Sequence, residues 1–131
     1  MKIKQDIISK IIEHAKREAP VEACGYLAAK DGIVERHYDL TNIDHSEDHF
    51  SFDPKEQFAI VKDARAKGYE VCAVYHSHPA TPARPSVEDI NLAYDPVISY
   101  VIVSLAGGQE DVKSFKIAGG KAEREDLEIV D

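Results

Sequence analysis

Residues 75–89 have the sequence YHSHPATPARPSVED, and this stretch decides where the fold places its chemistry. His76 and His78 are two residues apart at the end of a predicted strand, and side chains with this spacing point to the same face. Pro79 has no amide proton for a strand ladder, so we expect the strand to end directly after the pair. Both imidazoles should therefore face the same way at one end of a sheet.

The same stretch offers a third candidate ligand. Ser86 and Asp89 follow the pattern S-x-x-D that is typical of a helix start, and the proline-rich segment 79–85 is short and stiff enough to return that start over the strand end. Two imidazoles, one carboxylate and a water make the open coordination of catalytic zinc. Each half alone has an ordinary alternative, because a histidine pair is a weak metal signal and S-x-x-D fits a purely structural cap.

Further strands are expected on both sides of this stretch. Residues 69–75 are almost continuously apolar, which indicates a buried central strand. Residues 97–105 form a second buried strand, and residues 112–118 alternate between apolar and polar. Residues 127–130 complete the set as an edge strand.

The N-terminal third predicts a helix and a hairpin. Isoleucines that share one helical stripe indicate a helix over residues 3–18 that docks on the sheet. Asp31-Gly32 is a strong two-residue hairpin signal between strands 25–29 and 33–40. A polar loop follows, and residues 49–52 are expected as a short strand.

Asp53-Pro54 supplies a cap and a first helical residue, so a second helix is predicted to begin there and to end at Gly68. Its apolar side is expected to include Phe58, Val61 and Ala64. A short helix should run from Ser86 to about residue 94. The order of elements predicts a mixed α/β (α+β) fold with one main sheet.

Composition narrows the functional classes. A length of 131 residues fits a single domain over residues 1–131, with 44% hydrophobic and 31% charged residues as in ordinary globular proteins. Sixteen basic and 24 acidic residues give a formal charge of −8, which disfavours nucleic-acid binding. The N-terminus lacks the apolar core of a signal peptide and no apolar run is long enough to cross a membrane, so a cytoplasmic protein is expected.

The joined pattern resembles the JAMM motif of the JAB/MPN zinc metalloprotease family. HSHP, the seven residues from 79 to 85, and S-x-x-D match four functional positions and their spacing. The family places a glutamate just before the first strand of the hairpin, and Glu22 has that position in PVEACGYL, residues 20–27. FSFDP, residues 50–54, is similar to the small prokaryotic members. The resemblance covers roughly residues 5–118 and implies a JAB/MPN-like domain with a curved mixed sheet flanked by an N-terminal and a central helix.

The resemblance also implies roles for individual residues. His76, His78 and Asp89 would hold one zinc ion, with a water as fourth ligand. Glu22 would act as general base, and Ser86 would donate a hydrogen bond to the oxyanion. Without the resemblance, Glu22 is one of 24 acidic residues in a polar turn.

Family members cleave amide or isopeptide bonds, and the chain is too short for the insertions of eukaryotic deubiquitinases. The resemblance therefore implies a substrate such as a ubiquitin-fold sulfur carrier ending in Gly-Gly, or its amino-acid adduct, with the tail added to a sheet edge. Two alternatives stay open, namely a metal-free scaffold that binds partners and a zinc amidase of small molecules. A deaminase would need HxE and PCxxC, and the sequence has neither.

Other polar residues have ordinary interpretations. His45 and His49 lie in a solvated loop, and His14 and His37 are expected at the surface. Ser77, between the two histidines of the motif, should point to the opposite face and have a structural role. The two cysteines, at positions 24 and 72, fit free thiols in a reducing compartment, and a disulfide between them stays open until their geometry is known.

Overall fold

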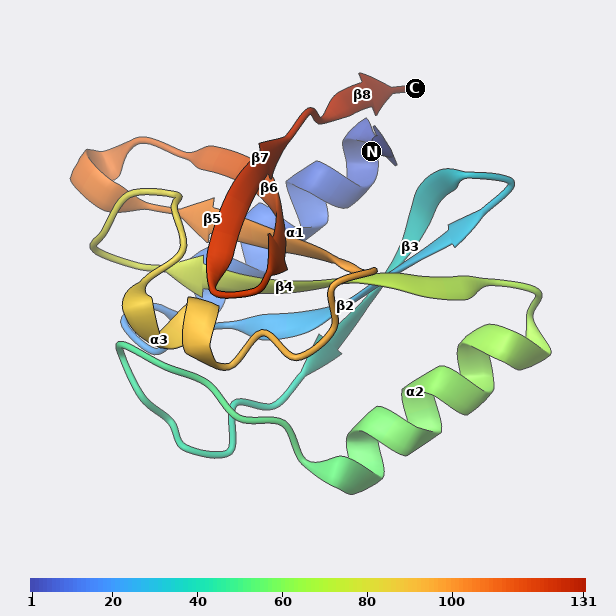
Figure 1. Ribbon diagram of the computed structural model, residues 1–131, viewed down its shortest axis with the longest axis horizontal. Helices are drawn as coiled ribbons and strands as arrows, with labels where there is room; N and C mark the ends of the chain where they lie inside the picture. Colours follow the sequence, from blue (N-terminus) through green and yellow to red (C-terminus); the bar gives the residue numbers. More distant parts are fainter.

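A computed structural model describes residues 1–131 as one curled, eight-stranded mixed sheet with three α-helices (Figure 1). The strands lie in the order β7-β6-β5-β4-β2-β3-β1-β8. The helices are α1 (Gln5–Glu18), α2 (Pro54–Ala66) and α3 (Val87–Asn91), with a short 3-10 turn at Ala106–Gly108. The strands are β1 (Lys2–Lys4), β2 (Cys24–Lys30), β3 (Ile33–Leu40), β4 (Glu70–His78), β5 (Ser99–Ser104), β6 (Asp111–Ala118), β7 (Lys121–Glu125) and β8 (Glu128–Val130).

Strand β4 is the central strand on which the site depends. It runs antiparallel to β2, with Cys24 opposite His76, and parallel to β5, with His78 opposite Ser104. The pairing reaches the last residue of β4, because the amide of Leu105, directly after β5, donates to the carbonyl oxygen of His78 at 3.1 Å. The end of β4 is therefore held on both sides.

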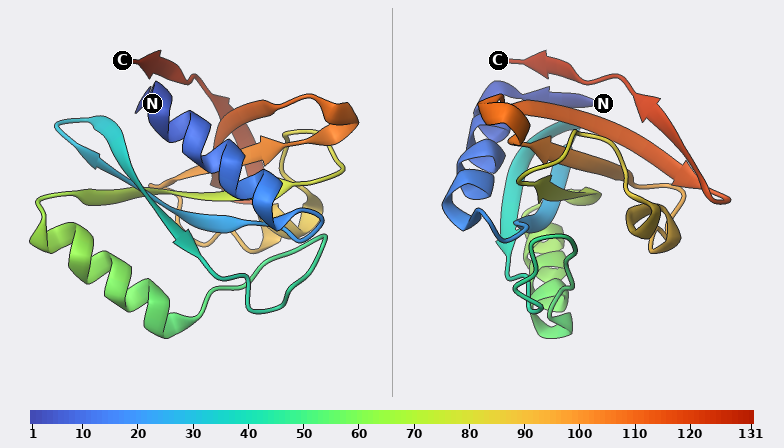
Figure 2. Two further views of the ribbon diagram at one scale, coloured as in Figure 1. Left: turned by 180° about the vertical axis from the view of Figure 1, so that it is seen from behind. Right: turned by 90° about the vertical axis from the view of Figure 1, so that its left-hand side faces the viewer.

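The helices lie on different sides of the sheet. Helix α1 covers one face, while α3 lies beyond the opposite face (Figure 2, right). The isoleucine stripe of α1 packs against apolar residues of the central strands, as expected from its spacing. The buried members of this core are Ile3, Ile7, Ile8, Ile11, Ala15, Leu27, Val34, Ala73, Tyr75, Val101 and Val103. None of the helices is both long enough and apolar enough to cross a membrane.

Gly25 lets β2 approach the ring of Tyr75 on this face. A Cβ atom at Gly25 would lie 2.2 Å from the carbonyl oxygen of Tyr38 and 2.3 Å from Cε2 of Tyr75. Real Cβ contacts do not reach such distances, so the closely packed interior requires glycine here.

Several expectations about the elements are wrong. The N-terminal helix begins at Gln5, because residues 2–4 pair with β3 and β8 as a short parallel strand. Residues 49–52 form no strand, although the amide of Ile43 still donates to the carbonyl oxygen of Ser51 at 3.1 Å. Strand β7 was not predicted, because its sequence KAERE is charged and its exposed edge position leaves no apolar pattern.

Helix α2 also differs from its prediction. Asp53 caps it as expected, with its carboxylate accepting from the amide of Lys55 at 2.9 Å. The predicted apolar side is buried only in part, because Ala64 is buried while Phe58 is 73% exposed. Glu56, in the first turn of the helix, accepts from the amide and hydroxyl of Thr41.

His14 was expected at the surface and is buried against Tyr75. The Tyr75 hydroxyl donates to Asp39 at 2.9 Å and lies 2.8 Å from Nδ1 of His14, which therefore donates to it. His37 is half-buried and also hydrogen-bonds Asp39, while Arg17 donates to the second oxygen of that carboxylate. These bonds tie α1 to β3 and β4 through one carboxylate.

This network predicts a pH-dependent contribution to stability. The hydrogen bond from His37, followed by the charge of His14, outweighs burial and lowers the pKa of Asp39 from 3.8 to about 2. Because the folded-state pKa is the lower one, Asp39 stabilises the fold above pH 4 and loses that contribution as the pH falls toward 2. We expect Asp39→Asn to lower the free energy of unfolding in urea at pH 6, and the gap to wild type to narrow at pH 3. An equal gap at both pH values would contradict this role.

Candidate active site

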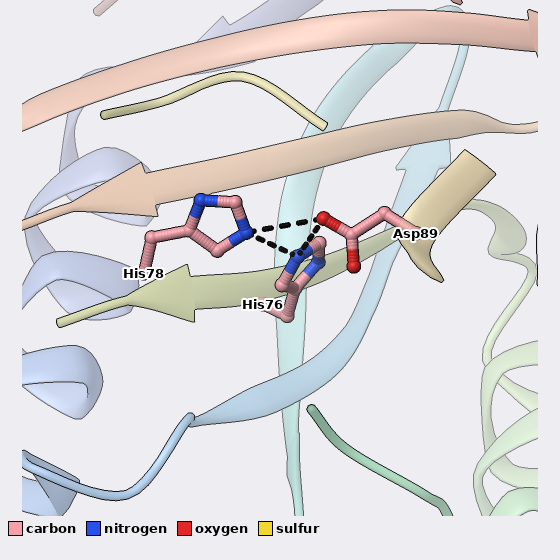
Figure 3. Close-up of side chains that lie close together, drawn as sticks. All are labelled: His76, His78 and Asp89. Carbon is pink, nitrogen blue, oxygen red and sulfur yellow. Dashed lines mark hydrogen bonds and ion pairs between the residues drawn. The ribbon is translucent and has the colours of Figure 1, made fainter. Parts of the chain in front are cut away.

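His76 and His78 point to the face opposite α1, where Asp89 of α3 meets them (Figure 3). Nε2 of His76 lies 3.1 Å from Nε2 of His78 and 3.2 Å from Oδ2 of Asp89. Nε2 of His78 lies 3.1 Å from the same carboxylate oxygen. Two strand residues and one helix residue therefore direct three ligand-type atoms at a common point, as the sequence predicted.

The donor set fits a small divalent cation. Around zinc at about 2.0–2.1 Å, tetrahedral ligand atoms lie about 3.3–3.4 Å apart, close to the spacing of these three atoms. One proton can bridge only one pair of them, whereas a cation attracts all three. Two imidazoles and one carboxylate leave a fourth position open, which is the pattern of catalytic rather than structural zinc.

Nearby groups orient the two imidazoles. Nδ1 of His78 lies 2.9 Å from the carbonyl oxygen of Pro82, which can only accept, so Nδ1 donates and Nε2 is free to bind a metal. The ring of His76 stacks on Phe50 with centroids 4.8 Å apart. This aromatic contact was not predicted, although Phe50 and Phe52 were visible in the sequence as an apolar pair beside a polar loop.

The charges of the cluster are strongly coupled. Burial opposes ionisation of Asp89, but hydrogen bonds from His76 and His78 outweigh it and hold the pKa of this carboxyl far below its usual range. Burial likewise opposes protonation of His78, while Asp89 and the Pro82 carbonyl raise its pKa. The carboxylate is thus ionised and available as a ligand.

Asp89 also starts helix α3. The amide of Ser86 donates to Oδ2 of Asp89 at 2.9 Å, and the amide of Asp89 donates to Oγ of Ser86 at 3.0 Å. This reciprocal capping box confirms the structural interpretation of S-x-x-D. The Ser86 hydroxyl is only an acceptor in this pair, so its proton remains free to donate.

Glu22 lies just before β2, near enough to the cluster for the charges of His78 and Asp89 to influence the pKa of its carboxyl. The amide of Ala23 donates to Oγ of Ser77 at 2.7 Å, and the amide of Ser77 donates to the Ala23 carbonyl oxygen at 2.9 Å. Cys24 pairs with His76 in the antiparallel ladder. If the same register continues for two more residues, Glu22 lies opposite His78 and on the same face of the sheet. Ser77 points to the other face and is structural, as expected.

The Glu22 side chain is 4% exposed, and its Oε1 has no hydrogen-bond partner. Burial raises the pKa of its carboxyl to about 8, against a smaller opposing effect of His78. A buried polar atom without a partner costs stability, so its presence in a native structure calls for an explanation such as a functional role. Such an atom fits a group that exchanges protons with a substrate.

A cavity of about 400 Å³ adjoins the cluster on the side of His76. His76 and Asp89 form part of its wall, and most of the remaining wall is apolar. Its aromatic residues are Tyr26, Phe50, Phe52, Tyr94 and Tyr100. The site therefore has a polar end at the histidines and an apolar extension beside them.

The competing residues lie outside the cluster. His49 is held between Asp44 and Asp48 at 3.2 Å each, and His45 is absent from the ligand group. Cys24 and Cys72 are free thiols, and burial raises their pKa values to about 12 and about 11. Neither thiol is a nucleophile near neutral pH.

A family model described as prokaryotic homologs of the JAB domain matches residues 4–118. The chain belongs to this family. It is 33% identical to the CysO-cysteine peptidase of Mycobacterium tuberculosis over 132 residues, covering 98% of this chain and 90% of the relative. It is 32% identical to the probable TtuB-protein conjugate cleaving protease of Thermus thermophilus over 120 residues, covering 91% of this chain and 77% of the relative.

Among solved structures, protein DSY2949 of Desulfitobacterium hafniense superposes with a TM-score of 0.89 at 42% identity, covering 98% of this chain and 92% of that one. The family and its named peptidases place the chain among hydrolases of peptide or isopeptide bonds.

The geometry predicts stoichiometric metal binding. Protein purified without chelator should contain about one zinc ion per chain by elemental analysis. His76→Ala and Asp89→Ala should each abolish the zinc, because two remaining ligands hold the ion poorly. His49→Ala is the matched control and should keep it, since His49 is bound to aspartates. Full zinc retention in both ligand variants would contradict a metal site at these residues.

Proposed function

We propose that the chain is a zinc-dependent peptidase that hydrolyses the amide bond after the Gly-Gly tail of a ubiquitin-fold sulfur carrier protein or its amino-acid adduct. The observation that carries this proposal is the placement of a buried, unpartnered carboxylate beside three convergent ligand atoms. His76, His78 and Asp89 hold the ion in this proposal. Glu22 and Ser86 act on the reacting atoms.

Zinc bound by these ligands supplies a Lewis acid for the scissile carbonyl and lowers the pKa of water to about 7. The ionised form of the Glu22 carboxyl would be favoured by a cation held beside it. Glu22 can then take the proton of the attacking water at its unpartnered Oε1. The water oxygen bonds to the carbonyl carbon, the carbon–nitrogen bond breaks, and Glu22 returns the proton to the leaving amine. The products are a carboxylate at the glycine end and a free amine.

Ser86 stabilises the negative charge that develops on the carbonyl oxygen. Its amide and Oγ are both occupied by Asp89, which fixes the hydroxyl beside the metal ligand. The hydroxyl proton is then directed at the substrate without any reorganisation during the reaction.

The substrate class rests on the relatives and on the shape of the site. One relative is named for a CysO-cysteine substrate and the other for TtuB-protein conjugates, which supports cleavage at a carrier tail. Glycines suit a tail whose carbonyl must reach deeply buried histidines, and the apolar cavity has room for the residues before them. Because β4 is paired on both sides, an extended tail that reaches the histidines cannot add to β4 itself.

The alternatives predict different behaviour. A metal-free scaffold has no need of a buried, unpartnered carboxylate beside an intact ligand set. An amidase of small molecules would hydrolyse short acyl-glycine amides as well as a carrier with one residue after Gly-Gly. Comparison of kcat/KM for the two substrates separates these functions, and we expect the carrier to be strongly preferred.

Replacement of Glu22 tests the proposed base. Glu22→Gln keeps the size and polarity of the side chain but cannot accept the proton. We expect turnover of the carrier fusion to fall by about 10²–10⁴-fold, the scale of general-base catalysis, with zinc content and melting temperature unchanged. Loss of zinc in this variant would instead make Glu22 a ligand or its support.

Two substitutions at Ser86 distinguish its capping role from its proposed catalytic role. Ser86→Ala should cost about 1 kcal/mol of stability through the lost cap. It should also cost about 10²–10³-fold in kcat through the lost oxyanion donor. Ser86→Asp restores a cap but adds an anion, so we expect recovered stability without recovered turnover. Turnover near wild type in Ser86→Asp would leave Ser86 with a structural role only.

A further inference from the structure

One buried amide side chain organises the loop between β3 and α2, coloured teal in Figure 1. Asn42 is 6% exposed. Its Nδ2 lies 3.1 Å from the carbonyl oxygen of Glu22, 2.9 Å from that of His49 and 3.4 Å from that of Ser46. Its Oδ1 accepts from the amides of Asp44 at 3.2 Å and Ser51 at 3.3 Å. A single side chain thus connects the loop to the backbone of Glu22.

The two ends of this amide have different partners. The Oδ1 end bonds only to other residues of the loop and shapes its turn. The Nδ2 end reaches out of the loop to Glu22 and also holds the carbonyl of His49, directly before Phe50. Phe50 stacks on His76. The NH₂ group of Asn42 therefore holds the backbone of Glu22 and also the backbone next to the residue that packs on the His76 imidazole.

Glu22 depends on such backbone anchors because Oε1 of its side chain has none. On one side, Ala23 is clamped to Ser77 of β4. On the other side, the amide of Glu22 donates to Ser46 at 2.9 Å, and its carbonyl accepts from Asn42. Removal of the Asn42 donor leaves the Glu22 backbone held on the loop side by the Ser46 bond alone.

We infer that Asn42 is a positioning residue, whose NH₂ group fixes the backbone of Glu22 so that the carboxylate meets the attacking water. This inference rests on the proposed function, in which Glu22 is the base. A misplacement of about 1 Å far from the reacting atoms can cost about 100-fold in rate. Asn42 touches no substrate, so its effect should appear in kcat and not in KM.

Asn42→Asp tests the donor end alone. Aspartate keeps the size and an oxygen for Asp44 and Ser51, but it turns a carboxylate toward the carbonyls of Glu22 and His49. With a carrier bearing one residue after Gly-Gly, we expect kcat to fall about 100-fold while KM stays within about twofold and one zinc per chain is retained. Asn42→Ala, which adds no charge, should show the same pattern if the aspartate variant folds poorly.

Ser114→Ala is the matched control for stability. Ser114 is fully buried on β6, away from the loop. The alanine variant loses one hydrogen bond of 2.8 Å from the Ser114 hydroxyl to Glu125. It should lower the melting temperature and leave kcat unchanged. Turnover near wild type in both Asn42 variants would overturn the inference, as would a loss of zinc that matches the loss of kcat.

The double variant Glu22→Gln/Asn42→Asp shows whether Asn42 acts through Glu22. If it does, the double variant should be no slower than Glu22→Gln alone. Losses that multiply would overturn the positioning role. Wild-type turnover in Glu22→Gln alone would contradict the proposed function instead, so the two failures are distinct.

Discussion

The pairing of β4 on both sides is the constraint on which the site depends. A strand that was free along one edge could twist or slip at its end, and a slip by one residue would turn both histidines to the other face. Here β4 pairs with β5 on one side and with β2 on the other. The two hydrogen bonds between Ala23 and Ser77 continue the contact with the β2 side almost to the end of β4. The rigid end of β4 sets the separation of the imidazoles before any ion binds.

The same constraint relates the two faces of the sheet. Alternation along β4 places Tyr75 and Ser77 toward α1 and His76 and His78 toward α3. Burial of the apolar residues under α1 therefore stabilises the strand register of β4 that directs His76 and His78 to the opposite face. The acidic network at Asp39 and the clamp at Ser77 belong to the structural face, yet each fixes a strand that carries a functional group on its reverse side.

Sequence reasoning succeeded where the signal was local. The alternation of His76 and His78, the proline that ends the strand and the cap at Ser86 all act within a few residues, and the structure has each of them. It failed where burial depends on a distant partner. His14 finds Tyr75 at a separation of 61 residues, and β1 becomes a strand only through its parallel neighbours. Sequence reasoning placed Phe50 in a short strand and Asn42 in a polar loop. It missed their contacts, because Phe50 stacks on a ring of β4 and Asn42 bonds to backbone that is distant in sequence.

Asp89 both caps helix α3 and is a candidate metal ligand, and one carboxylate serves both roles. Helix α3 spans five residues, too few to persist alone, and the carboxylate that starts it is also the one that faces the histidines. If these three residues hold an ion as proposed, ion binding would stabilise α3, and an ordered α3 would raise the affinity for the ion by the same free energy. Ser86, the proposed oxyanion donor, belongs to this unit as well, because it caps the same helix. In the proposed function, binding of the ion and ordering of Ser86 would therefore be one cooperative event.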